Sequence, residues 1–145
     1  MDGELPAITG KRGEYQIIGK LMQEGFIVYT PVLDCDGVDC VIKNEKGRLI
    51  EIQIKTRNKG EGYNKQFIIK RPLKCDVNFF ICCYLLDKEE VWFIPPYLFQ
   101  KLSTIENGST ILTMDLEKEK ELLSYKGERG IMVLKNEEPS YEEKK

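Results

Sequence analysis

The sequence contains no histidine among its 145 residues. This absence excludes a serine–histidine or cysteine–histidine triad, an HNH-type nuclease site and any zinc site that uses histidine. The available catalytic groups are therefore carboxylates, amides, lysine, hydroxyls, thiols and a metal ion bound by oxygen atoms.

Long apolar runs are also missing. No stretch reaches the length of about 18 apolar residues that a transmembrane helix needs. The acidic start, Met1–Glu4, is followed by no apolar segment and does not resemble a signal peptide. The five cysteines are odd in number, and neither a disulfide framework nor a structural zinc site is expected. We therefore predict a cytoplasmic protein with one domain over residues 1–134 and a disordered polar tail over residues 135–145.

The charge of the chain is unevenly distributed although its net value is only −2. Residues 43–74 hold ten basic and three acidic side chains, a net charge of +7, in an otherwise acidic chain. One interpretation is a solvated, lysine-rich hairpin, and the other is a surface that contacts nucleic-acid phosphates. On the second interpretation, the phosphate-contacting residues are Arg57, Lys59, Lys65, Lys70 and Arg71.

Apolar periodicity predicts a helix over residues 11–24 that ends at Gly25, and a mixed sheet with flanking helices. The turn signal Asn44–Gly47 joins two of the strands as a hairpin, and the apolar run 77–86 predicts a strand that is buried on both faces. The strands are predicted at 26–32, 38–43, 48–56, 67–69, 77–86, 90–94 and 111–114, and further helices at 97–102 and 117–125.

Glu14 interrupts the apolar face of the first predicted helix. On a helical projection it falls near the middle of the stripe formed by Ile17, Ile18 and Leu21. A carboxylate buried alone there would cost several kcal/mol or would take up a proton. Glu14 therefore either joins a polar site or lies in the first turn of the helix, where the dipole favours a carboxylate.

Three polar residues meet on the predicted hairpin. Asp39 is placed opposite residues 52–53, and Gln53 and Lys55 share one face of the next strand. Carboxylate and amide oxygens suit Mg²⁺, which polarises a phosphate and lowers the pKa of a bound water. Lys55 can neutralise the charge that develops on the phosphate, and Glu14 can reach the same cluster. The alternative is that these residues form the solvent face of an amphipathic hairpin.

The runs KRGEYQ, GVDCVI and EIQIKT together resemble the PD-(D/E)XK nuclease superfamily. The helix start is similar to that of archaeal Holliday-junction resolvases, and the Gln-x-Lys pair resembles a branch that includes some homing endonucleases. The resemblance covers about residues 10–103. It implies a restriction-endonuclease-like three-layer α/β fold, a magnesium ion that manganese can replace, and a DNA substrate. The matching positions are Glu14, Asp39, Gln53 and Lys55.

Gln53 departs from the family pattern, because a carboxylate is expected two residues before Lys55. Glu51, on the same face, can compensate for the missing charge. We expect a metal-dependent DNA endonuclease that pairs as a homodimer, since one site per chain must cut two strands. The first alternative is a catalytically inactive DNA-binding or protein-interaction module on the same fold. The second is an unrelated α/β binding domain.

Overall fold

The chain begins with a long helix, α1 (Pro6–Gln23), in the computed structural model, which describes residues 5–33, 37–58, 65–70, 73, 76 and 78–138. The helix starts five residues before the predicted position at residue 11, because Pro6 is compatible with a first helical turn. It ends near the predicted position, before Gly25, which has a positive φ of 98°.

The central sheet has five strands in the order β1-β2-β3-β5-β6, and the parallel pairing of β3 with β5 makes it mixed. Strands β2 and β3 form the predicted antiparallel hairpin, with Cys40 opposite Ile52. All residues of β5 are buried, as the apolar run predicts. The mixed sheet expected from the sequence is thus confirmed. Its strands are β1 (Ile27–Tyr29), β2 (Cys40–Lys43), β3 (Leu49–Arg57), β5 (Phe79–Leu85) and β6 (Glu90–Ile94).

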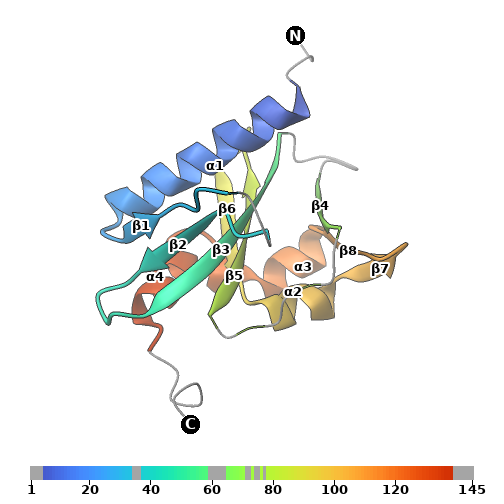
Figure 1. The fold of residues 1–145 in the computed structure, drawn as a ribbon. Helices are drawn as coiled ribbons and strands as arrows, with labels where there is room; N and C mark the ends of the chain where they lie inside the picture. The colour runs from blue at the N-terminus through green and yellow to red at the C-terminus, as the bar shows by residue number, and fades with distance from the viewer. Residues whose placement is uncertain are drawn as a thin grey trace.

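Helices and a smaller second sheet cover the central sheet (Figure 1). Helix α1 and the C-terminal α4 pack on one face, through Ile17, Leu21 and Leu134 among others. Helix α2 and strands β4 and β8 pack on the other face, through Phe67, Phe99 and others. The remaining elements are β4 (Gln66–Ile69), α2 (Pro96–Leu102), β7 (Thr104–Glu106), β8 (Ser109–Thr113), α3 (Leu116–Glu121), the 3₁₀ turn η2 (Leu123–Tyr125) and α4 (Glu128–Asn136).

Three elements differ from the prediction. Strand β7 was not expected; Asn107 and Gly108, which join it to β8, both have positive φ, which suits a tight hairpin turn. The helix predicted over 117–125 breaks into α3 and η2. Helix α4 was not expected, and it packs closely on the preceding turn because Gly130 has no side chain to meet the Tyr125 carbonyl.

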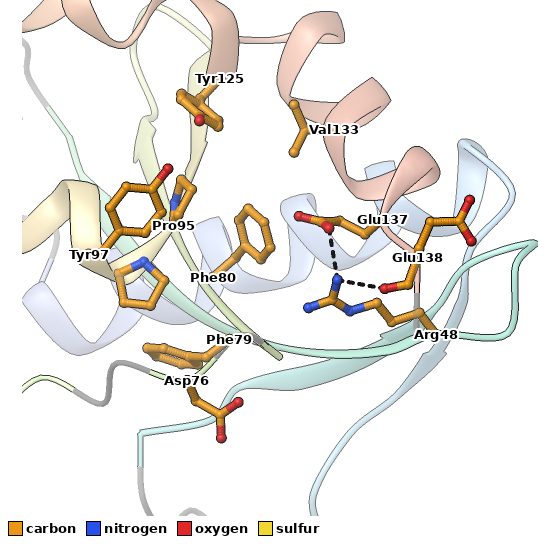
Figure 2. Close-up of a pocket in the computed structure, with 11 residues that line it drawn as sticks. Arg48, Asp76, Phe79, Phe80, Pro95, Tyr97, Tyr125, Val133, Glu137 and Glu138 are labelled. Carbon is orange, nitrogen blue, oxygen red and sulfur yellow. Dashed lines mark hydrogen bonds and ion pairs between the residues drawn. The ribbon is translucent and has the colours of Figure 1, made fainter. Parts of the chain in front are cut away.

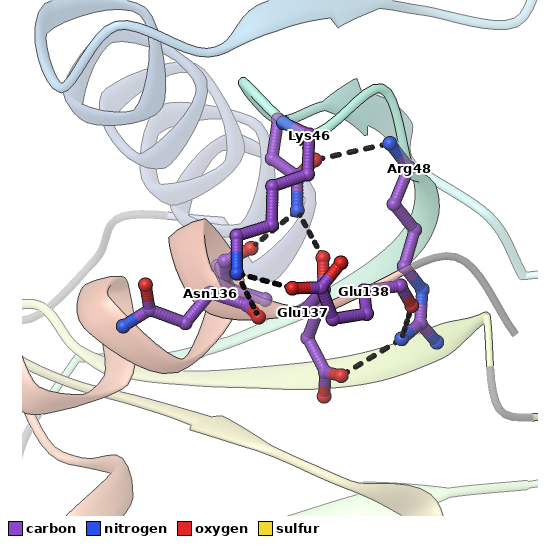
Figure 3. A network of polar contacts seen from close by, with 7 residues as sticks. Lys46, Arg48, Asn136, Glu137 and Glu138 are labelled. Carbon is purple, nitrogen blue, oxygen red and sulfur yellow. Dashed lines mark hydrogen bonds and ion pairs between the residues drawn. The ribbon is translucent and has the colours of Figure 1, made fainter.

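The end of α4 is held by the turn between β2 and β3 (Figure 3). The side-chain amide of Asn44 donates to the carbonyl oxygens of Leu134 and Glu137, each at 2.9 Å. Arg48 pairs with Glu137 at 2.7 Å, and Lys46 pairs with Glu138 at 2.6 Å. Basic groups at a helix C-terminus also complement the helix dipole.

The predicted tail over residues 135–145 is therefore ordered at its start. Helix α4 runs to Asn136, and the next two residues contact the hairpin turn. This order comes from long-range contacts that a local reading of a polar segment does not reveal. Residues 139–145 lie outside the described residues, and the extent of the single domain stays a prediction.

We predict that Gly13→Ala destabilises the fold. Gly13 of α1 is buried against β3, and an added Cβ would lie 2.8 Å from Cβ of Thr56 and would overlap its hydroxyl and methyl groups. Overpacking of this kind costs about 1–3 kcal/mol of unfolding free energy, which urea denaturation measures. The matched control is Gly10→Ala on the same helix, where an added Cβ meets no atom within 4 Å. It should be neutral or stabilising by up to about 1 kcal/mol, and equal effects of the two changes would contradict the proposed contact.

Candidate functional site

Asp39 sits where the pairing of β2 with β3 ends. Its backbone N–H donates to the carbonyl of Ile52 at 2.9 Å, and its carboxylate Oδ2 accepts from the backbone N–H of Ile54 at 2.6 Å. This confirms the predicted placement opposite residues 52–53. The Asp39 carboxylate therefore replaces a backbone carbonyl as the acceptor for this N–H of β3. The carboxylate is consequently fixed in position on the hairpin rather than free to rotate.

Glu14 follows the contact of Gly13 with β3 and lies at the edge of the buried stripe. That stripe consists of Thr9, Gly13, Ile17 and Leu21, so the predicted central position of Glu14 is wrong. The side chain keeps 17% of its surface exposed and pairs with Lys11 at 3.1 Å. The cause of the difference is that the small Gly13 turns the buried face of α1 away from Glu14. The carboxylate therefore has a partner and stays partly accessible.

Glu14 and Asp39 line the same pocket, with a volume of about 230 Å³. Burial, followed by the nearby charges of Asp39 and Glu14, raises the pKa of the neighbouring Cys40 thiol to about 12. Lys11, Tyr15 and Val38 are further lining residues, so the pocket has one basic side chain and one aromatic side chain at its margin.

Gln53 and Lys55 project from the face of β3 opposite to α1. A Cβ added to Gly37 would lie 3.0 Å from Nε2 and 3.5 Å from Oε1 of Gln53, so this amide lies against the loop that leads into Asp39. The Lys55 ammonium lies near Cys83 and opposes the effect of burial on the pKa of that thiol. Among the described residues, neither Gln53 nor Lys55 lines the pocket of Glu14 and Asp39. Of the four predicted site residues, Glu14 and Asp39 thus line the pocket, whereas Gln53 and Lys55 project from the face of β3 opposite to α1.

The oxygen donors at this end of the hairpin are of the type that a hard divalent cation prefers. Glu14 and Asp39 carry carboxylate oxygens, and Gln53 adds a neutral amide oxygen. The described part of the chain has no group of three histidine, cysteine, aspartate or glutamate residues placed to hold a metal ion. A site built here would therefore rely on the amide, on water or on substrate oxygens to complete the coordination shell. Glu51, the predicted accessory residue, is half-buried on β3 opposite Val41.

Several basic residues of the segment 43–74 pair with acidic residues. Lys65 lies 3.8 Å from Glu119, and Lys46 and Arg48 pair with the end of α4. Lys70 is exposed and Arg57 is half-buried, while the predicted contacts Lys59 and Arg71 lie outside the described residues. The prediction did not assign Lys11 and Tyr15 a role at the site, although the spacing of Lys11 from Glu14 is that of a helical ion pair.

A larger pocket of about 470 Å³ lies elsewhere, at the start of β5 (Figure 2). Its charged lining residues already have partners: Arg48 pairs with Glu137, Glu138 pairs with Lys46, and the Asp76 carboxylate accepts from the Asn78 N–H. None of the four predicted site residues lines it. The larger pocket is therefore a weaker candidate for a catalytic site than the smaller pocket. Its apolar wall consists of Phe79, Phe80, Pro95, Pro96, Tyr97, Tyr125 and Val133.

No protein-family model and no curated protein sequence matches this chain. Its structure is similar to that of a bacterial homing endonuclease, I-Ssp6803I, with a TM-score of 0.68 and 16% sequence identity. The match covers 99% of this chain and 100% of that one. At this identity the likeness establishes the fold, which is the nuclease-like α/β fold predicted from the sequence. No helix in the described part of the chain is long and apolar enough to cross a membrane.

We predict that Cys40 lowers the stability of the protein at alkaline pH. The pKa of the folded thiol is about 12 against an ordinary value of 9.0, so the unfolded chain loses this proton first as the pH rises. The unfolding free energy must therefore fall above pH 9. Between pH 9 and 10.5 the advantage of wild type over Cys40→Ala should shrink by about 1.6 kcal/mol. Tyrosine and lysine titrations cancel in this difference, which should be constant from pH 6 to 8; a constant difference at all pH values would contradict the assignment.

Proposed function

We propose that this chain is a Mg²⁺-dependent DNA endonuclease whose site consists of Glu14, Asp39, Gln53 and Lys55. The observation that carries the proposal is the convergence of the Glu14 and Asp39 carboxylates on one pocket. It occurs in a fold similar to that of a bacterial homing endonuclease, at the hairpin end that also bears Gln53 and Lys55. The metal ligands in this proposal are Glu14, Asp39 and Gln53.

The bound ion supplies Lewis-acid activation of the scissile phosphate and of a water molecule. The Ile54 N–H fixes the orientation of the Asp39 carboxylate. This carboxylate would therefore need little reorganisation to bind an ion. Glu14 would hold the ion in place of its present contact with Lys11. Lys55 stabilises the negative charge that grows on the phosphate oxygens.

Gln53 lowers the negative charge of the site compared with a third carboxylate. Weaker metal affinity follows, because ligand charge is one of the factors that set the affinity of oxygen sites. Glu51 lies on the same face of β3 and supports the site directly or through water. The same feature favours one alternative, a catalytically inactive DNA-binding or protein-interaction module.

DNA is held in this proposal by basic residues that flank the hairpin end. Arg57, Lys59, Lys65, Lys70 and Arg71 remain the proposed phosphate contacts, and Lys65 would exchange Glu119 for phosphate. The functional unit is a homodimer, since a two-fold pair presents one site to each strand.

We predict that the protein nicks or cuts supercoiled plasmid in Mg²⁺ or Mn²⁺. Asp39→Asn removes the charge while it keeps an oxygen acceptor for the Ile54 N–H, and Lys55→Met removes the ammonium. Each should lower the cleavage rate about 100-fold or more. The matched controls, Asp87→Asn and Lys43→Met, change exposed residues of the same types and should cleave at the wild-type rate.

The proposal of an enzyme fails if the wild-type protein cleaves no DNA with any divalent metal. The substrates must include linear, branched, mismatched and single-stranded DNA. Retained DNA binding in that case would identify the inactive module.

We also predict that Gln53→Glu tightens Mg²⁺ binding by on the order of tenfold, because it adds a carboxylate beside Asp39. The measurement is the rise in melting temperature across a Mg²⁺ titration, which follows from mass action and needs no activity. Gln23→Glu introduces the same charge at the exposed end of α1 and should leave the titration unchanged. If both variants respond alike, Gln53 does not contact the ion.

A further inference from the structure

The pocket shared by Glu14 and Asp39 combines two kinds of lining residue. Besides the two carboxylates and Lys11, apolar and aromatic side chains from α1 and from the loop after β1 line it. Tyr15 keeps 67% of its surface exposed and Val32 is fully exposed, so a ligand in the pocket can reach both. We call Tyr15, Ile18 and Val32 the apolar wall of the pocket.

A phosphodiester brings its nucleoside into the same space. In the proposed site the scissile phosphate lies at the carboxylates, through the metal ion, so the adjoining nucleoside lies in the pocket or at its rim. Two carboxylates repel a second phosphate group there, whereas the apolar wall suits the flat face of a base. The volume of about 230 Å³ equals roughly eight water molecules at about 30 Å³ each. This is room for one base and not for a base pair.

Tyr15 and Lys11 together form the kind of surface that binds single-stranded nucleic acid. The Lys11 ammonium lies 6.0 Å from the centre of the Tyr15 ring and 3.1 Å from the Glu14 carboxylate. Aromatic rings stack on bases of any sequence, and basic groups beside them follow the backbone. A base inside a duplex is stacked on both faces and paired at its edge. Only an unpaired base can therefore offer a face to Tyr15.

We propose that Tyr15 stacks on one unpaired base of the nucleotide next to the scissile phosphate. The inference rests on the proposed function and narrows its substrate to DNA that contains an unpaired nucleotide, as in a bulge, a mismatch, a flap or a single strand. Tyr15 sets specificity in this proposal and takes no part in breaking the bond. The ring, and not the hydroxyl, is the group that recognises the base.

Binding to three end-labelled DNA molecules tests the proposal. The first is a perfect duplex, the second has one extra nucleotide in one strand, and the third carries that extra nucleotide without its base. Fluorescence anisotropy at one fixed salt concentration gives the Kd of each, in Ca²⁺, which takes the same oxygen ligands as Mg²⁺. Gels show that the strands stay intact. The wild type should bind the second DNA at least fivefold more tightly than the first or the third.

The base preference is the ratio of the Kd values for the third and second DNA. Tyr15→Leu should abolish it and should bind the DNA without the base as the wild type does, whereas Tyr15→Phe should keep it. The matched control is Tyr29→Leu, at a tyrosine 49% exposed on the central sheet, which should also keep it. A variant that is only less stable would bind both DNA molecules more weakly by the same factor, so the ratio isolates the contact of Tyr15 with the base.

Three outcomes would overturn the proposal. The first is a wild type that binds the three DNA molecules equally or binds none of them. The second is a preference lost equally in Tyr15→Leu and Tyr29→Leu, and the third is a preference that Tyr15→Phe loses as well. A Tyr15-dependent preference in a protein that cleaves no DNA would support this inference and contradict the proposed function. Cleavage without any base preference would do the reverse, so the two failures are distinguishable.

Discussion

The close approach of α1 to β3 at Gly13 determines where the candidate site forms. Because Gly13 has no side chain, the helix backbone lies against Thr56, and the next residue, Glu14, reaches the pocket that Asp39 also lines. The same contact orients the whole helix. It buries Ile17 and Leu21 in the core and directs Tyr15 outward. One small residue therefore couples the packing of the first layer to the position of a carboxylate.

The hairpin of β2 and β3 is held at both ends, by different interactions. At one end the Asp39 carboxylate accepts from the Ile54 N–H, and at the other end Asn44, Lys46 and Arg48 bind the C-terminal turn of α4. Side chains projected from this strand pair are consequently fixed relative to each other. Fixed groups suit a site whose ligands must converge on one ion, because little reorganisation is then needed on binding. The contact with α4 also neutralises part of the basic segment, so its charge of +7 overstates the surface open to phosphate.

Most of the fold could be predicted from local patterns. The hairpin, the strand buried on both faces and the strand over Glu90–Ile94 follow from period-two alternation, turn residues and a continuous apolar run. Helix α4 escaped prediction because it is short and is stabilised by distant residues, Asn44 and Arg48 above all. The break between α3 and η2 was also missed. For the candidate site, the residue types and the register of Asp39 against β3 could be predicted, since both depend on hairpin geometry alone.

The sequence by itself determined which chemical groups this protein can use. Without histidine, its reactive groups are carboxylates, amides, hydroxyls, thiols and lysine, and the alternation of β3 sets Gln53 and Lys55 on one face. Tertiary structure alone decided that Glu14 shares a pocket with Asp39 and lies at the edge of the buried stripe. It also decided that Lys46 and Arg48 pair with carboxylates after α4. The physical reason is the range of the interactions. Alternation and turns act over a few residues, whereas these placements depend on how α1 and α4 pack against strands far away in the chain.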